Sequence, residues 1–214
     1  LDEFAGPGAV DSTSRNADAI YEPGVVFFLE GPSSGRFCRA GEVNRAAHFA
    51  GGRLRSRAEG LGERYSVSLW FWNGMPVEGR EVSGWMFSRG RDNSLEARGE
   101  HLGVGGKAGH PGRLVFLHGD GSAGAQLAGG RTEIARWSWN QVTLVRDAGR
   151  VRVYLNGNPQ PEIDVEAGGA APVGSELFVG GRCDNQSNWE GRLDEVAVFD
   201  RALSVQEIQV LSAR

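Results

Sequence analysis

Residues 65–72, which read Y-S-V-S-L-W-F-W, restrict the fold more than any other stretch, because they carry bulky side chains on both faces of one strand. Side chains of a strand point alternately to opposite faces. The odd-numbered residues therefore share one apolar face, while Trp70 and Trp72 lie on the other. A strand of this kind fits the middle of a packed two-layer β-structure.

Seven further short segments have strand-like patterns and are separated by glycine-rich turn signals such as Asn156-Gly157 and Gly180-Gly181. They span residues 84–88, 113–118, 141–146, 151–155, 163–165, 176–179 and 193–199. The 33 glycines follow no fixed period, which favours turns over a fibrous repeat. Short strands at regular spacing predict an all-β fold, a two-sheet antiparallel jelly-roll sandwich forming one domain over residues 1–214. The glycine-rich residues 99–112 are expected to form a long, mobile loop.

Only the C-terminal end of the chain predicts a helix. Ser204-Val205-Gln206-Glu207 has the pattern of a capping box, in which the Ser204 hydroxyl accepts from the Glu207 amide. Leu203 and Ile208 occupy the two positions of a hydrophobic staple. We expect this short helix to pack on the rim of the sandwich.

Charge and hydropathy exclude several classes of function. The net charge is −4 with a single lysine, so no basic stripe for nucleic acid is present. No apolar run approaches about 18 residues, so direct membrane insertion is not expected. The chain opens at Leu1 to Phe4 within an apparent strand, which indicates a piece excised from a longer protein. Cys38 and Cys183 lie outside any C-x-x-C spacing; a disulfide is possible in principle, and two free thiols are favoured.

Three carboxylates on alternate residues, Glu162, Asp164 and Glu166, form the pattern that most suggests catalysis. Retaining glycosidases hold two carboxyl groups about 5–5.5 Å apart. Backbones four residues apart on a regular strand are separated by roughly 13 Å. Only a strongly curved sheet with converging side chains would close that gap. A glycoside hydrolase using this run is therefore the alternative function, and no catalytic residue is assigned.

The same run has a structural explanation in a hairpin with residues 151–155. Aligned apolar faces require a register in which every second pair is apolar. The predicted pairs are Val153 with Ile163, Val151 with Val165, Arg152 with Asp164 and Arg150 with Glu166. Opposite charges paired across strands stabilise by roughly 0.2–1 kcal/mol. We expect the carboxylates to face solvent on this ribbon.

Two long segments resemble laminin G-like domains of the concanavalin A-like lectin/glucanase superfamily. Residues 139–157 contain W-N-Q-V-T-L-V-R-D and G-R-V-R-V-Y-L-N-G, and residues 191–204 read G-R-L-D-E-V-A-V-F-D-R-A-L-S. Further similarity lies in residues 11–18, 47–52, 65–72 and 177–182. The resemblance covers nearly the whole chain and implies a jelly-roll sandwich.

The resemblance also bears on the acidic run. Glucanases of the lichenase and laminarinase type carry their catalytic residues in a run written E-I-D-[IV]-E. In lichenase-like relatives that run precedes a Y-V-N-G-like strand, whereas here it follows residues 154–157. The resemblance therefore implies a non-catalytic recognition or adhesion module that binds carbohydrate or a protein partner. A structural spacer without a ligand is a third interpretation.

Many laminin G-like domains carry calcium, and the resemblance implies such a site. Its candidate ligands here are Asp11, Asn16, Asp18 and Asp194, which offer the hard oxygen atoms that calcium prefers. Alternatively, Asp11 and Asp18 stabilise turns and Asp194 accepts from nearby backbone amides.

Six tryptophans are candidates for stacking on sugar rings, although each is also a common packing residue. Trp70 and Trp139 are predicted to be core residues. Four others border loops or strand ends and are the better candidates for exposure, although partial burial is the commoner case for such residues: Trp72, Trp85, Trp137 and Trp189. Trp189 ranks first because Asn185 and Asn188 place polar amides beside it. The expected ligand site is thus formed by rim loops around Trp189 and Trp85, in an exported protein that is extracellular, periplasmic or on the cell surface. Its expected partner is a glycan or an extracellular protein.

Overall fold

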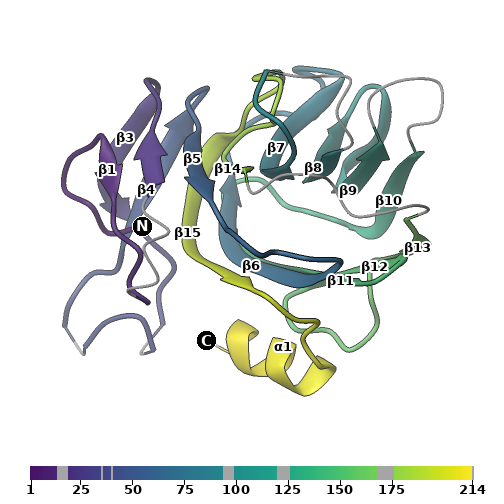
Figure 1. Cartoon of the computed structure of the whole chain (residues 1–214). Helices are drawn as coiled ribbons and strands as arrows, with labels where there is room; N and C mark the ends of the chain where they lie inside the picture. Colours follow the sequence, from purple (N-terminus) through teal and green to yellow (C-terminus); the bar gives the residue numbers. More distant parts are fainter. Residues whose placement is uncertain are drawn as a thin grey trace.

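The computed structural model describes residues 1–13, 19–34, 36–39, 41–93, 99–119, 126–167 and 176–213. They form two antiparallel sheets packed face to face, with one helix below (Figure 1). The predicted all-β sandwich is confirmed, and each of the eight predicted strands lies within an observed one. No helix formed by the described residues is long and apolar enough to cross a membrane.

The two sheets contain every strand in the described part of the chain. Sheet A has the order β1 (Gly8–Ala9), β2 (Ala19–Tyr21), β5 (Leu54–Arg57), β14 (Glu176–Val179), β7 (Val82–Arg89), β8 (Gly99–Gly106), β9 (Gly109–Gly119) and β10 (Gln126–Glu133). Sheet B has the order β13 (Ile163–Glu166), β12 (Arg150–Leu155), β11 (Trp139–Asp147), β6 (Arg64–Asn73), β15 (Glu190–Phe199), β4 (Arg45–Ala50) and β3 (Val25–Glu30).

Strand β6 lies in the middle of sheet B, between β11 and β15, as its two bulky faces predict. Its odd-numbered side chains from Tyr65 to Phe71 are completely buried in the core between the sheets. Its even-numbered side chains point to the outer face of sheet B. The coverage of that outer face determines which tryptophans can reach a ligand.

The prediction of a mobile loop over residues 99–112 is wrong, because these residues form β8 and the start of β9. All eight residues of β8 are buried, and its glycines allow close backbone contact. A Cβ on Gly103 would lie 2.4 Å from the Gly84 carbonyl oxygen, and one on Gly105 would lie 2.3 Å from the His110 carbonyl oxygen. These glycines therefore serve close packing in a central strand, not loop flexibility.

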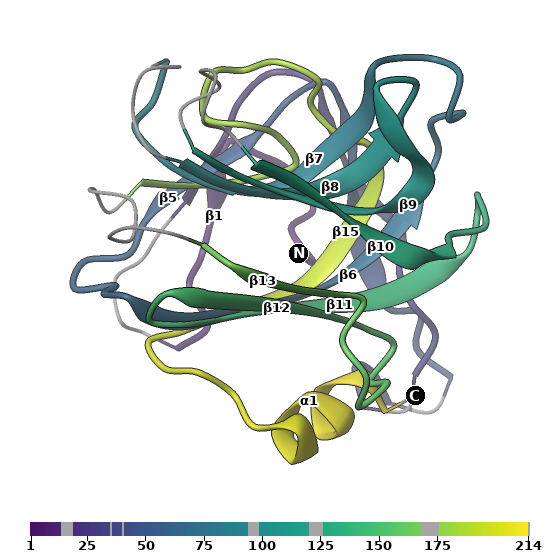
Figure 2. The same cartoon turned by 90° about the vertical axis from the view of Figure 1, so that its right-hand side faces the viewer.

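Helix α1 (Val205–Ser212) has the predicted capping box. The Ser204 Oγ accepts from the Glu207 amide at 3.3 Å, and the Ser204 amide donates to the Glu207 carboxylate at 2.9 Å. Leu203 and Ile208 are buried with Val145 and Tyr154 of sheet B. The helix thus covers part of the outer face of sheet B, whereas the sequence predicted the rim (Figure 2).

Two further expectations concern the first residues of the chain and the two cysteines. Leu1 to Phe4 precede the first strand, β1, so the prediction of a strand there is wrong. Cys38 and Cys183 are not joined by a disulfide, in agreement with the interpretation that the sequence favoured.

Candidate functional site

The charged ribbon of the acidic run forms at the edge of sheet B with the predicted register. Arg150 lies opposite Glu166 and Arg152 opposite Asp164. The Arg150 guanidinium donates two hydrogen bonds, of 2.6 and 2.8 Å, to the Asp164 carboxylate. These bonds hold the pKa of Asp164 below its ordinary value. The Glu166 side chain is 77% exposed, so these two carboxylates face solvent as predicted.

Glu162 does not face solvent, and that prediction is wrong. Only 9% of the residue is exposed. Its carboxylate accepts from the Arg131 amide at 2.7 Å, the Thr132 amide at 2.9 Å and the Thr132 hydroxyl at 2.8 Å. Burial raises the pKa of Glu162, but the hydrogen bonds from Thr132 and Arg131 outweigh burial and leave the pKa below its ordinary value. Glu162 therefore links the edges of the two sheets and is held in its ionised form.

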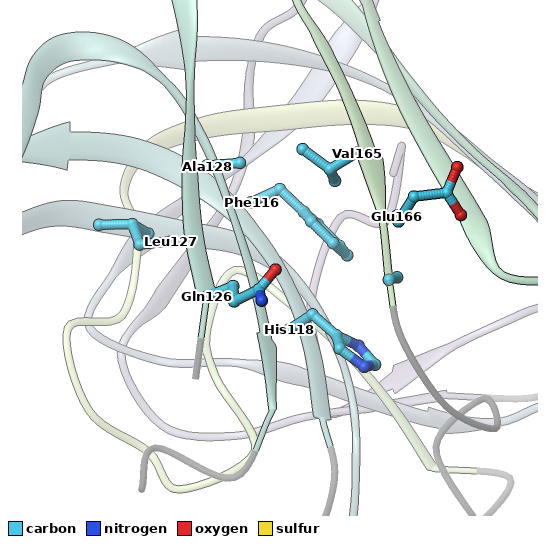
Figure 3. Close-up of a pocket in the computed structure, with 8 residues that line it drawn as sticks. Phe116, His118, Gln126, Leu127, Ala128, Val165 and Glu166 are labelled. Carbon is cyan, nitrogen blue, oxygen red and sulfur yellow. The ribbon is translucent and has the colours of Figure 1, made fainter. Parts of the chain in front are cut away.

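A pocket of about 380 Å³ opens beside this edge, between β9, β10 and β13 (Figure 3). Apolar atoms come from Phe116, Leu127, Ala128, Val165 and Ala167, and polar groups from His118, Gln126 and Glu166. Phe116 and Val165 approach each other from opposite sheets, whereas Leu127 points away (Figure 3). Glu166 is the one carboxylate in this described lining. A retaining glycosidase needs two carboxylates about 5–5.5 Å apart.

A buried ionic cluster lies behind the pocket and joins the two sheets. The Tyr65 hydroxyl and the Arg146 guanidinium both donate to the Glu100 carboxylate. All three side chains are completely buried. His118, which lines the pocket, places its Nδ1 3.4 Å from the same carboxylate. Burial, and then the charge of Glu100, raise the pKa of Tyr65. Because Glu100 belongs to sheet A and Tyr65 and Arg146 belong to sheet B, the cluster has the character of a structural tie.

The rim loop predicted to bind a ligand does gather the predicted residues, but it buries both indoles. Trp189 is 0% exposed and Trp85 is 1% exposed, so the prediction of exposure is wrong for both. Trp189 packs edge-on against Phe71 in the core, at 6.0 Å between ring centroids. Trp85 packs edge-on against His101 at 5.8 Å and lies under the Arg182 guanidinium. Neither indole offers a face to a sugar in this conformation.

The two asparagines hold that loop, residues 180–189, in place. The Asn188 Nδ2 donates to the Gly51 carbonyl at 2.8 Å and to the Asn185 Oδ1 at 2.6 Å. The Trp85 amide donates to the Ser187 carbonyl at 3.0 Å. We call residues 180–189 the amide loop. The Asn188 side-chain amide and the Asn185 side-chain oxygen are thus used within the protein, which the polar sequence alone did not reveal.

The outer face of sheet B shows three degrees of coverage along β6. Ser66 is covered by the segment that leads into α1, since its Oγ accepts from the Leu203 amide at 3.0 Å. Trp70 is 2% exposed beneath Phe37, whose ring lies 5.6 Å away. Trp72 is partly exposed. The expectation of an exposed Trp72 and a buried Trp70 is therefore confirmed.

Trp72 belongs to a group of indoles and guanidiniums at this uncovered end. In the sheet register Trp72 lies between Arg192 of β15 and Trp139 of β11. The Arg192 guanidinium stands 5.0 Å from the centre of the Trp72 ring. Trp139, predicted to be buried in the core, is partly exposed instead. Outer-face neighbours on adjacent strands have Cβ atoms about 4.5–5.5 Å apart, so these three side chains form a continuous row.

Trp137 adds the most exposed indole next to this row. It is 63% exposed, as predicted, and its amide donates to the Asn73 carbonyl at 3.0 Å, directly after Trp72 in β6. The Arg136 guanidinium lies 4.3 Å from the centre of the Trp137 ring. Trp137 has a φ of 61°, a left-handed conformation that is rare for a bulky residue and often found at ligand sites. We call Trp72, Arg136, Trp137, Trp139 and Arg192 the tryptophan face.

The predicted calcium ligands are not assembled in the described part of the chain. Asp194 is buried and accepts from the Leu1 amine at 2.7 Å and from Asn44 Nδ2 at 2.8 Å. Asp11 accepts from the Thr13 amide at 2.9 Å. Asn16 and Asp18 lie outside the described residues. Within the described ranges no three histidine, cysteine or acidic residues converge on a possible ion. One buried carboxylate does not make a calcium site by itself, so calcium stays a prediction.

Comparison with known proteins supports the fold. A laminin G family model, described as the concanavalin A-like lectin/glucanases superfamily, matches residues 50–209. No curated protein sequence matches the chain. Domain 4 of the extracellular arabinanase AbnA from Geobacillus stearothermophilus, in complex with arabinotriose, superposes with a TM-score of 0.65 at 19% identity, covering 95% of this chain and 92% of that domain.

Two further solved structures are similar. The ligand-binding domain of botulinum neurotoxin serotype D, in complex with N-acetylneuraminic acid, has a TM-score of 0.66 at 13% identity and covers 95% of this chain and 47% of its own. A heptameric SAP-like pentraxin from Limulus polyphemus has a TM-score of 0.55 at 19% identity, covering 88% and 82%. At these identities the likeness shows the fold alone.

Proposed function

Because the chain belongs to the laminin G-like domains of the concanavalin A-like lectin/glucanase superfamily, we propose that it is a non-catalytic carbohydrate-binding module. One observation carries the proposal: the tryptophan face presents Trp72, Trp137 and Trp139 at the uncovered end of sheet B. An indole offers a large, rigid apolar surface together with a polar N–H group. Such surfaces suit sugar rings, whose C–H faces are apolar and whose edges carry hydroxyl groups.

The similar structures support the ligand class. One of them was solved with arabinotriose and another with N-acetylneuraminic acid, so this sandwich architecture is used for sugar binding in other proteins. A module of this kind meets polysaccharides outside the cytoplasm, and we place it in an extracellular, periplasmic or cell-surface protein.

The alternative, a glycoside hydrolase, lacks support from the acidic run. Glu162 binds amides of β10, Asp164 pairs with Arg150, and Glu166 stands at the rim of the pocket. The three carboxylates are thus committed to different partners and do not form a catalytic pair. Cleavage of mixed-linkage glucan that is lost in Glu162→Gln would overturn the non-catalytic proposal.

The proposed function is tested by a glycan array and by titration calorimetry with each glycan that binds. Trp137→Ala is expected to weaken binding about 10-fold or more, the size of a truncated hot-spot aromatic. Phe4→Ala is the matched control, because Phe4 is 79% exposed and lies outside the tryptophan face. Silence of the wild-type protein across all glycans at high concentration would instead indicate a spacer.

Calcium binding is a separate proposal with its own test. Hard oxygen ligands from residues 11–18 together with Asp194 would hold the ion, and its binding would stabilise the folded state by mass action. Melting temperature is measured with added calcium and with a chelator. An unchanged melting temperature, with no metal found by elemental analysis, would remove calcium from the account.

A further inference from the structure

We propose that the tryptophan face selects polysaccharides that carry carboxylate groups, an inference that rests on the proposed carbohydrate-binding function. The ligand class follows from the two arginines of this face. Arg136 and Arg192 each place a guanidinium over an indole, at 4.3 and 5.0 Å from the ring centres.

Neither arginine of the tryptophan face has an ion pair within the described ranges. Arg136 donates through one terminal nitrogen to the Gly74 carbonyl, and Arg192 donates through one terminal nitrogen to the Glu30 carbonyl at 2.8 Å. Neither forms an ion pair with any described acidic residue, whereas Arg53 and Arg150 do. No described residue accepts from the remaining terminal nitrogen of either guanidinium, so its N–H donors are open to a ligand on this part of the chain.

The acidic residues closest to Arg192 along β15 are already engaged. Glu190 pairs with Arg80, and Asp194 is buried against Asn44. Among the described residues, the tryptophan face itself thus carries two guanidiniums and no carboxylate, in a chain whose net charge is −4. A positive patch of this kind attracts anionic ligands at low ionic strength.

Guanidinium chemistry distinguishes a carboxylate from a hydroxyl group. Its planar fork of donors matches the two oxygens of a carboxylate, and such charge-assisted bonds are about twice as strong as neutral ones. Stacking on the indole holds each fork in a fixed plane beside the surface on which a sugar ring would rest. The face thus combines a stacking surface with carboxylate recognition.

The layout favours a polymer over a single acidic sugar. Arg192, Trp72 and Trp139 are aligned across three neighbouring strands, which span about 10 Å at the spacing of strands in a sheet. Arg136 and Trp137 continue the face at the end where β11 begins. A chain with repeated uronic acid units would place carboxylates near both arginines.

The test compares polygalacturonate with the same polymer in its fully methyl-esterified form, in calcium-free buffer containing a chelator. The two polymers share backbone and hydroxyl groups and differ at the carboxyl group, which is a charged carboxylate in one and a neutral methyl ester in the other. We expect polygalacturonate to bind about 10-fold more tightly at 50 mM salt, and the difference to shrink at 500 mM salt, because salt screens exposed charges.

Arginine variants assign the preference to this face. Arg136→Gln combined with Arg192→Gln is expected to abolish the preference for the acidic polymer while the indoles remain. Arg113→Gln is the matched control, since Arg113 is an exposed arginine of sheet A without a described ion pair. Circular dichroism and thermal melting confirm that each variant is folded.

The outcomes separate this inference from the proposed function. Equal affinity for both polymers, with loss of binding in Trp137→Ala, would overturn the acidic preference and leave carbohydrate binding intact. A preference that survives the double arginine variant, or no binding to either polymer, would also overturn the inference. Loss of the preference in the double variant alone would support it.

Discussion

Two groups of tryptophans in one sandwich have opposite environments. Trp85 and Trp189 lie beneath the amide loop and are almost completely buried. Trp72 and Trp139 lie on the outer face of sheet B and are partly exposed, and Trp137, shortly before β11, is 63% exposed. Residue type is the same in both groups, so the difference comes from what covers them.

The polar residues beside the two groups show that a polar sequence does not by itself indicate a ligand site. Asn185 and Asn188 look like ligand-binding amides, but they bond to each other and to the backbone, and they fix the loop over Trp85. Arg136 and Arg192 stack on indoles at the surface and leave donors available. A short asparagine completes internal turns, whereas a long arginine can remain exposed beside an aromatic ring.

The largest expected effect is the loss of stability when a tryptophan of the buried group is removed. Trp189→Ala should lower the free energy of unfolding by about 3–5 kcal/mol, because it leaves a cavity between the sheets. Trp137→Ala should change it by less than about 0.5 kcal/mol, as for an exposed residue. Urea unfolding measures both values. A small loss for Trp189→Ala would show that the two groups do not differ as described.

A histidine lies near each group of tryptophans, and the pKa values of the two histidines can be compared. Burial, and then the charge of Arg182, lower the pKa of His101 beside Trp85 to about 3. The unfolded chain takes up this proton below about pH 6.5, but the folded chain does so only near pH 3, so stability is lost as the pH falls between these values. The full contribution is on the order of 5 kcal/mol, since each unit of pKa shift corresponds to about 1.4 kcal/mol.

His48, paired with Arg192 on the outer face, is the comparison residue. It is partly buried, and burial and then Arg192 lower its pKa. Histidine resonances followed by NMR from pH 8 to pH 4 should show His48 titrating below the ordinary range and His101 remaining neutral throughout. Titration of His101 near pH 6.5 would contradict its burial in the structure.

A middle-sized effect concerns binding by the exposed group. Trp72→Ala and Trp139→Ala should each weaken glycan binding about 5- to 30-fold, as expected when a partly exposed aromatic contact is removed. Affinity is measured by calorimetry with the best glycan of the array. Asn185→Ala in the amide loop is the control and should leave affinity unchanged. A stronger effect of Asn185→Ala than of both tryptophan variants would move the ligand to the amide loop.

A last pair of variants, compared by stability and not by affinity, concerns the carboxylates of the acidic run. Glu162→Gln should lower the free energy of unfolding by about 1–3 kcal/mol, because charged hydrogen bonds to Arg131 and Thr132 are weakened. Glu166 lies four residues further along the same run and is exposed. Glu166→Gln should therefore change the free energy of unfolding by less than about 0.5 kcal/mol. Equal effects would remove the structural role assigned to Glu162.

Local patterns in the sequence predicted the strands whose faces carry clear alternation. Residues 65–72 gave the centre of sheet B, and aligned apolar faces gave the register of β12 with β13. Strand β8 could not be found in this way, because its glycines have no side chains that could alternate. These glycines allow close backbone contact with neighbouring segments. Strands could therefore be predicted from the sequence wherever the alternation of their own side chains was clear.

The candidate site was harder to predict from the sequence. Whether a side chain near the surface is covered depends on segments that are distant in the sequence. Trp70 is covered by Phe37, and Trp85 is covered by residues nearly a hundred positions later. Exposure was predicted correctly for Trp72 and Trp137, which no described segment covers completely, and wrongly for Trp85, Trp189 and Trp139. The stacked arginines were missed, although Arg136 stands directly beside Trp137 in the sequence.

The most direct measurement follows the six indole N–H signals by two-dimensional NMR during titration with trigalacturonate. Each signal is assigned by a Trp→Phe variant. We expect the signals of Trp72, Trp137 and Trp139 to shift and those of Trp85 and Trp189 to stay unchanged. Shifts confined to Trp85 and Trp189 would place the ligand at the amide loop and contradict the tryptophan face as the binding surface.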